Sequence, residues 1–157
     1  MTWLLTILLV FGVLPHAIGV SWGDDFQKGL AAYNKKDYAT AINEWAALAA
    51  EGNATAQLNL GIMYAKGEGV PQDDKSSVKW LRRAAESGNA VAQVNLGFMY
   101  QYGKGITKNE VEAVKWYRFA AEQGNIEGQV NLGLMYRSGK GVGQDYVLSH
   151  MWWSIAA

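Results

Sequence analysis

The stretch AQLNLGIMY at residues 56–64 decides the fold, because the chain repeats it twice more. It returns as AQVNLGFMY at residues 92–100 and as GQVNLGLMY at residues 128–136, each time after 36 residues. Other residues keep the same step, among them Trp80, Trp116 and Trp152. Such recurrence is typical of repeat proteins, in which each unit buries its apolar face against the next unit.

Each unit is predicted to form two helices, since its apolar residues recur at spacings of three and four. In the first unit these residues are Ala56, Leu60, Met63 and Tyr64 in one helix, and Ser77, Trp80, Leu81 and Ala84 in the other. A glycine-containing loop joins the two helices, and a Gly-Asn pair separates successive units. Connections this short place neighbouring helices antiparallel. We therefore predict an all-α, right-handed α-solenoid of antiparallel helix hairpins.

Polar residues and glycines mark the ends and the contacts of these helices. The N-cap of the second helix, whose side-chain oxygen accepts from free N–H groups, is expected at Asp73, Asn109 and Asp145. Asn109 is also expected to form a capping box with Glu112. Mid-helix glycine costs about 1 kcal/mol relative to alanine, and it occurs at Gly61, Gly97 and Gly133. This repeated cost predicts close approach of another helix. The large tryptophan rings are expected to fill the space beside Ser77, Ala113 and Ser149.

The periodicity divides the chain into five parts. Residues 1–19 are predicted to be a signal peptide. Residues 24–52 pair two helices through a short turn and lack the longer loop, which indicates an N-terminal capping hairpin. Repeat 1 covers residues 53–89, repeat 2 covers residues 90–125, and repeat 3 covers residues 126–157. The third repeat is expected to be truncated, because the sequence stops before the closing glycine.

The N-terminal segment differs from all that follows. An apolar run ends at Pro15, and the small residues Ala17 and Gly19 stand where a signal peptidase reads. A cleaved signal would direct the protein to the periplasm or out of the cell. The alternative is an uncleaved anchor extending to about residue 23, since that uncharged length can just span a bilayer. The protein would then be anchored in the inner membrane and face the periplasm.

Composition argues against several classes of function. Fourteen Lys and Arg balance fourteen Asp and Glu, without the basic excess of a nucleic-acid-binding protein. The chain has no cysteine, which excludes disulfides and cysteine metal sites, and its two histidines, His16 and His150, are too few for a metal cluster. No nucleophile stands in a pattern with a base. We therefore expect no enzyme activity, no cofactor, no metal and no nucleic-acid partner.

The recurring pattern resembles a known family. Ala-x-Ala-Gln-x-x-Leu-Gly-x-x-Tyr, then Gly-x-Gly-Val, Asp and small-x-x-Trp-x-x-x-Ala-Ala-x-x-Gly, is similar to Sel-1-like repeats, which are relatives of tetratricopeptide repeats with a longer loop. The opening hairpin resembles an ordinary tetratricopeptide unit at Gly29, Ala41 and Trp45. The resemblance covers residues 24–157 and implies an α-solenoid that acts as an adaptor or scaffold. Exported bacterial relatives contact envelope or host proteins, and some cysteine-rich ones are described as binding or slowly hydrolysing β-lactams.

By resemblance to the tetratricopeptide arrangement, the first helices line the concave surface. Positions identical in all units serve the fold, whereas concave positions that vary are free to serve a ligand. We expect a partly apolar groove for a protein or peptide partner, formed by Leu58, Ile62, Val94, Phe98, Gln101, Tyr102, Val130, Leu134 and Arg137. The alternative is that Leu58, Val94 and Val130 merely close the seam between helices. The invariant amides are expected to hydrogen-bond between neighbouring units or to loop carbonyls; they are Gln57, Gln93 and Gln129 with Asn59, Asn95 and Asn131. The alternative is that they bind the backbone of an extended ligand.

The second helices carry two further surfaces of distinct composition, one basic and one apolar. The basic face is formed by Lys79, Arg82, Arg83, Lys115 and Arg118. It is expected to be solvated, and the alternative is that it binds an anionic partner. The C-terminal end is apolar, with Met151, Trp153 and Ile155 and no following helix in the sequence. Because solenoids need capped ends for solubility, we expect this end to contact a partner or a second copy, as a homo-oligomer. The alternative is that the sequence is a fragment.

These observations support one leading function and two alternatives. The leading interpretation is an exported scaffold or adaptor that mediates protein–protein interaction through the concave helix face. One alternative is a β-lactam-binding or weakly hydrolysing protein, as described for the cysteine-rich relatives. The other is a structural assembly subunit that associates through its C-terminal face.

Overall fold

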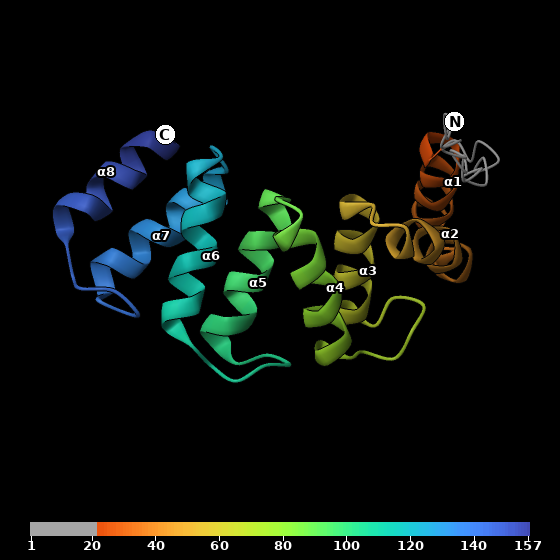
Figure 1. Cartoon of the computed structure of the whole chain (residues 1–157), viewed down its shortest axis with the longest axis horizontal. Helices are drawn as coiled ribbons and strands as arrows, with labels where there is room; N and C mark the ends of the chain where they lie inside the picture. The colour runs from red at the N-terminus through yellow and green to blue at the C-terminus, as the bar shows by residue number, and fades with distance from the viewer. Residues whose placement is uncertain (1–21) are drawn as a thin grey trace, which may run out of the picture.

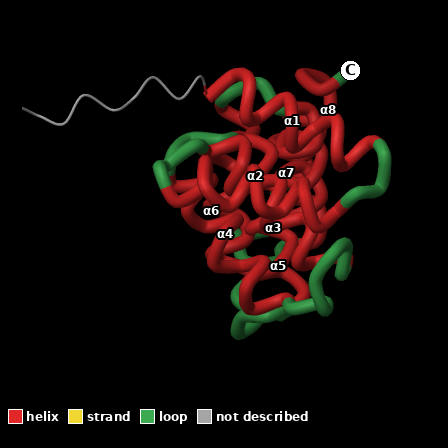
Figure 2. The backbone as a smooth tube through the Cα atoms, turned by 90° about the vertical axis from the view of Figure 1, so that its right-hand side faces the viewer, coloured by secondary structure: helices red, strands yellow, loops and turns green. Residues whose placement is uncertain are grey.

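A computed structural model describes residues 22–157 of the chain, which form eight α-helices and no strand (Figures 1 and 2). The helices are α1 Trp22–Asn34, α2 Tyr38–Ala50, α3 Ala54–Lys66, α4 Asp74–Glu86, α5 Ala90–Tyr102, α6 Glu110–Glu122, α7 Ile126–Ser138 and α8 Tyr146–Ala156. They follow one another along a single axis from α1 to α8, and the three longer loops lie along one edge (Figure 1). The predicted all-α solenoid of helix hairpins is confirmed. The predicted signal peptide lies outside the described residues.

The first helix of each repeat is capped at both ends as its sequence predicts. Asn53 accepts a hydrogen bond from the N–H of Ala56 at 2.9 Å, and Asn89 and Asn125 do the same one and two units later. The helices end in left-handed glycines, Gly67, Gly103 and Gly139, a conformation that glycine adopts without steric cost. No helix among residues 22–157 is long and apolar enough to cross a membrane.

The second helices are also capped as expected, but the predicted capping box is wrong. Asn109 accepts from the N–H of Glu112 at 3.1 Å, which is half of such a box. The other half is missing because the N–H of Asn109 donates to the carbonyl of Tyr100 at 2.9 Å, closing the loop between α5 and α6. The Glu112 carboxylate instead lies 3.7 Å from the ammonium of Lys115.

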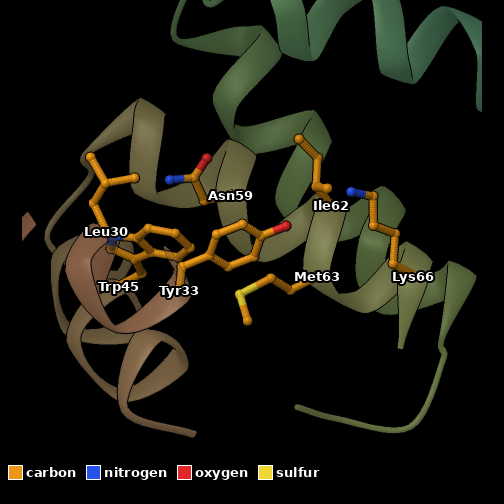
Figure 3. Close-up of a pocket in the computed structure, with 7 residues that line it drawn as sticks. All are labelled: Leu30, Tyr33, Trp45, Asn59, Ile62, Met63 and Lys66. Atoms are coloured by element: carbon orange, nitrogen blue, oxygen red, sulfur yellow. The ribbon is translucent and has the colours of Figure 1, made fainter. Parts of the chain in front are cut away.

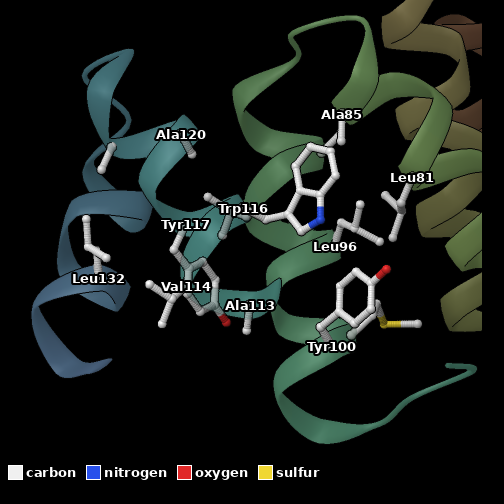
Figure 4. Packing of buried hydrophobic residues seen from close by; sticks show 14 of the residues in the cluster. Leu81, Ala85, Leu96, Tyr100, Ala113, Val114, Trp116, Tyr117, Ala120 and Leu132 are labelled. Carbon is white, nitrogen blue, oxygen red and sulfur yellow. The ribbon is translucent and has the colours of Figure 1, made fainter. Parts of the chain in front are cut away.

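The mid-helix glycines mark close helix contacts, as predicted. A methyl group at Gly97 would lie 2.7 Å from the ring of Tyr117, which follows Trp116 in the chain. Leu81 and Trp153 take the same place against Gly61 and Gly133. One residue along a helix is a rotation of about 100°. Trp116 therefore turns away from Gly97, and its ring lies beside Ala85 and Leu96 in Figure 4.

The buried core runs through the stack in two parts that meet at α3. One part joins the capping hairpin to α3 and includes Trp45, Leu48, Leu60 and Met63. The other extends from Leu58 of α3 through repeat 2 to α7 (Figure 4). Because α3 contributes side chains to both parts, it links the hairpin to the repeats.

Polar side chains connect each unit to its neighbour. Gln57 Nε2 donates to the carbonyl of Ala49 at 3.0 Å, and Gln93 and Gln129 repeat this bond, as predicted for these amides. Arg82 donates to the hydroxyl of Tyr100 at 2.8 Å. The same contact recurs one unit later, between Arg118 and Tyr136. Two arginines that we expected on a solvated face therefore reach across to the next repeat.

The loops also contact the unit before them. Gly105, in the loop between α5 and α6, has a φ of 65° and lies against the backbone of Asp74, where a side chain would collide. Gly141 has a φ of 67° and lies in the same way against the backbone of Glu110. Each of these loops therefore touches the start of the second helix of the preceding repeat.

Candidate functional site

Two neighbouring hollows open beside α3. We call the surface formed by their lining residues, which include Phe98, the groove face. The first hollow, of about 200 Å³, is lined by Leu30, Tyr33, Trp45, Asn59, Ile62, Met63 and Lys66. Figure 3 shows Tyr33 and Trp45 of the capping hairpin facing the side chains of α3. The second hollow, of about 170 Å³, is lined by Ile62, Ala65, Lys66, Gln72, Asp74, Leu81, Asn95, Phe98, Met99 and Lys104. Ile62 and Lys66 line both hollows, so the two are neighbours along the surface.

The first hollow has a fixed polar edge. The hydroxyl of Tyr33 donates to Glu68 Oε2 at 2.8 Å, and the ammonium of Lys66 lies 3.9 Å from Glu68 Oε1. The hydrogen bond to Glu68, with a smaller effect of burial, raises the pKa of Tyr33 to about 12. This hydrogen bond holds the loop carboxylate of Glu68 beside the hollow.

The second hollow has an aromatic and cationic edge. The rings of Phe98 and Tyr102 lie 4.6 Å apart between centroids, and both side chains are exposed. The ammonium of Lys104 stands 5.3 Å from the Phe98 centroid, within the range of a cation–π contact. An apolar surface and a positive charge thus lie next to each other at this hollow.

The structure separates the residues predicted for the groove into two groups. Leu58 and Val94 are only 8% and 7% exposed, because the following repeat covers them, so they lie in the seam between units. Val130, at the same position in repeat 3, is 38% exposed, since no described helix follows α8 to cover it. Ile62 lines the hollows, and Phe98, Tyr102 and Leu134 are exposed on the first helices.

Two predicted groove residues make internal contacts. Gln101 Oε1 accepts a hydrogen bond of 2.7 Å from the hydroxyl of Tyr117, whose pKa burial raises. The guanidinium of Arg137 lies 5.6 Å from the centroid of the Trp153 ring. Trp153 itself donates to the carbonyl of Val130 at 3.2 Å. Trp153, which we expected at the end face, thus packs onto α7.

The other two predicted end-face residues do point outward. Met151 is 41% exposed and Ile155 is 55% exposed on α8. Sequence reasoning missed Leu30 and Tyr33 as parts of the groove face, because the hairpin was interpreted only as a cap. It missed Lys104 because that residue lies in the loop between α5 and α6, outside the first helices. The sequence did contain a signal: when Gly29 is aligned with Gly61, Leu30 falls at the position of Ile62. Within residues 22–157, no three His, Cys, Asp or Glu side chains are grouped to hold a metal ion.

Comparisons with known proteins identify the repeat. A profile of the Sel1 repeat matches residues 54–89, 90–125 and 126–157, whereas no curated protein matches the chain. The Sel1 repeat protein from Oxalobacter formigenes is 39% identical, with a TM-score of 0.80 over 84% of this chain and 54% of that one. A protective antigen of uropathogenic Escherichia coli strains, displaying an SLR fold, is 38% identical, with a TM-score of 0.82 over 86% of this chain and 30% of that one.

A third structure shares the fold alone. Helicobacter pylori cysteine rich protein B is 17% identical, with a TM-score of 0.62 over 75% of this chain and 87% of that one. This chain spans about half the length of the Oxalobacter formigenes protein and under a third of the antigen. The repeat profile covers all three units that the internal comparison of the sequence defines. The chain therefore belongs to the Sel1 repeat family.

Proposed function

We propose that the protein is an exported scaffold that binds an extended segment of a partner protein on its groove face. Sel1 repeat solenoids generally serve as scaffolds for protein–protein interaction. The observation that carries the proposal is the pair of neighbouring hollows, which share Ile62 and Lys66 and lie at successive junctions between units. Two adjacent hollows suit a chain that places one side chain in each.

The chemistry of the groove face supports this role. Exposed Phe98 and Tyr102 offer rigid apolar contact area, and aromatic residues are enriched where partners bind most strongly. Lys66 and Lys104 add positive charge at the rim of the second hollow. The polar side chains Asn59 and Asn95 line the hollows on successive first helices. Such an apolar centre with a polar rim is the usual anatomy of a protein interface.

Peptide selection tests the binding surface. The purified protein is used to select from a phage-displayed peptide library, and the enriched peptide is titrated by fluorescence anisotropy. Phe98→Ala and Ile62→Ala are expected to weaken binding by about tenfold or more, the loss typical of an interface anchor. Val111→Ala is the matched control, because Val111 is 64% exposed on α6, away from both hollows. No enriched peptide, or equal losses in all three variants, would contradict the proposed surface.

Export is the second part of the proposal. It is supported by the uncharged apolar segment before Pro15 and the small residues Ala17 and Gly19. We expect the mature protein in the periplasm or the medium, lacking residues 1–19. Mass spectrometry of the protein from fractionated cells checks this. An intact N-terminus in the membrane fraction would instead favour the anchored alternative.

A further inference from the structure

Each second helix of the three repeats carries one row of exposed side chains, and the charge and polarity of this row change along the solenoid. Residues at equivalent positions, four apart on each helix, form one exposed row per repeat. On α4 the row is Lys75, Lys79 and Arg83; on α6 it is Val111, Lys115 and Phe119; on α8 it is Val147, Met151 and Ile155. The row is thus cationic in repeat 1, mixed in repeat 2 and wholly apolar in repeat 3.

The α8 row is strongly exposed. Val147 is 79% exposed, Ile155 is 55% exposed and Met151 is 41% exposed. Helix α8 contains no Asp, Glu, Lys or Arg, unlike α4 and α6. Val147 and Met151 also border an open hollow together with Tyr146 and His150. An uncharged helix that shows this much apolar surface is typical of an interaction site.

A further stacked repeat would not cover this row. Repeat 1 and repeat 2 are each followed by another unit, yet their rows remain exposed, with Val111 at 64% and Phe119 at 42%. The position of Met151 corresponds to Lys79 and Lys115, which are exposed as well. Stacking buries a different position, that of Leu58 and Val94. The α8 row therefore needs another explanation.

We propose that the α8 row pairs with the α8 row of a second copy of this chain across a two-fold axis. In such a contact the same surface patch meets itself, so any charge near the axis faces a like charge. The α4 row, with Lys75, Lys79 and Arg83, would repel its own copy. The α8 row carries no charge, so Val147 and Met151 of the two protomers can meet without repulsion between like charges.

The charge around α8 disfavours a lipid bilayer as the surface that covers the α8 row. Anionic membranes attract surfaces rich in Lys and Arg, and apolar insertion is most effective beside such residues. From Glu110 to the end of α8 there are four basic residues and five acidic ones. The apolar row is thus set in a slightly acidic region, which suits a protein partner better than an anionic bilayer.

The small size of this contact predicts a reversible dimer. Helix α8 has 11 residues, and one short row is smaller than the interface of a permanent dimer. The dimer is therefore reversible and forms as the concentration rises. It would present two groove faces at once, which strengthens binding to a partner that carries two recognition segments.

Cysteine cross-linking tests the contact directly, because the natural chain contains no cysteine. Met151→Cys is treated with a short bismaleimide, and Lys115→Cys, at the equivalent position on α6, is the matched control. We expect a covalent dimer from Met151→Cys and only monomer from Lys115→Cys. Equal cross-linking of the two variants, or none with Met151→Cys at high protein concentration, overturns the proposal.

Light scattering coupled to size exclusion over a concentration series provides the second test. The variant Val147→Lys, Met151→Lys, Ile155→Arg gives α8 basic side chains like those of the α4 row. It should remain monomeric while the natural protein dimerises, with the same helical circular dichroism. Val111→Lys with Phe119→Arg on α6 should leave dimerisation unchanged. A monomeric natural protein, an open-ended polymer, or binding to anionic vesicles without dimerisation would each refute two-fold pairing.

Discussion

The ring of Tyr117 occupies the space that any side chain on Gly97 would need. Tyr117 is 1% exposed, and its hydroxyl donates to Gln101 at 2.7 Å. Both burial of the ring and the hydrogen bond of its hydroxyl therefore fix its position. The glycine is therefore fixed by packing between α5 and α6, and its two counterparts, Gly61 and Gly133, serve the same purpose in their repeats.

Gly97→Ala is expected to destabilise the protein. The new methyl group would lie 2.7 Å from the Tyr117 ring, and overpacking of a core costs about 1–3 kcal/mol. Alanine recovers about 1 kcal/mol of helix propensity, which leaves a net loss of up to about 2 kcal/mol. Urea denaturation measures this difference. Gly143→Ala is the control, since its methyl group would meet no atom within 4 Å; equal stability of both variants would mean that Tyr117 moves aside.

The arginine–tyrosine bonds between repeats should be energetically coupled. A double-mutant cycle with Arg118→Ala and Tyr136→Phe is expected to give a coupling free energy of roughly 0.5–1 kcal/mol. The 2.7 Å contact between the guanidinium and the hydroxyl is its physical cause. Arg83→Ala combined with Tyr136→Phe should show no coupling, because the Arg83 guanidinium lies over the Trp80 ring instead.

Replacing Ser77 by Ala is expected to stabilise the protein. The Ser77 hydroxyl is buried and makes no hydrogen bond within the described residues, and such a group costs about 1–3 kcal/mol of desolvation. Repeat 2 already has alanine at the equivalent position, Ala113. Thermal unfolding should show a rise in midpoint for Ser77→Ala and a fall for Ala113→Ser. A lower midpoint for Ser77→Ala would show that the hydroxyl is satisfied in solution.

The bond between Tyr33 and Glu68 predicts a pH dependence at high pH. The pKa of Tyr33 is raised from 10.0 to about 12, so the folded state holds the phenolic proton more tightly than the unfolded state. The contribution of the Tyr33–Glu68 hydrogen bond to stability is complete below pH 10 and is lost as the pH rises toward about 12. Denaturation at pH 9 and pH 11 should show a smaller loss for Tyr33→Phe than for the natural protein. Equal losses would place Tyr33 outside this linkage.

The helices and their contacts could be predicted from the sequence where a repeated residue has a local cause. Asn53 caps a helix through a bond to its own third neighbour, and Gly97 reports a contact at its own position. Such signals depend on spacing along the chain, and three copies make them visible. The family and the α-solenoid follow from the same recurrence.

Contacts that depend on how helices cross could not be predicted in the same way. Trp116 and Tyr117 are neighbours in the chain, and only the orientation of α6 decides which ring faces Gly97. Leu58 and Phe98 both lie on first helices, but the next repeat covers only Leu58. The reach of Arg118 to Tyr136 likewise requires the position of one unit relative to the next.

The loop glycines that touch the preceding repeat have a consequence for the shape of the whole molecule. Gly105 and Gly141 set how near each unit comes to the start of the helix before it. A bulkier residue there would act as a wedge, and the tilt it introduced would add to the tilt at the other junction. Small changes in these loops would thereby alter the curvature of the superhelix, so related chains can vary the width of their binding surface without changing a residue that lines the groove face.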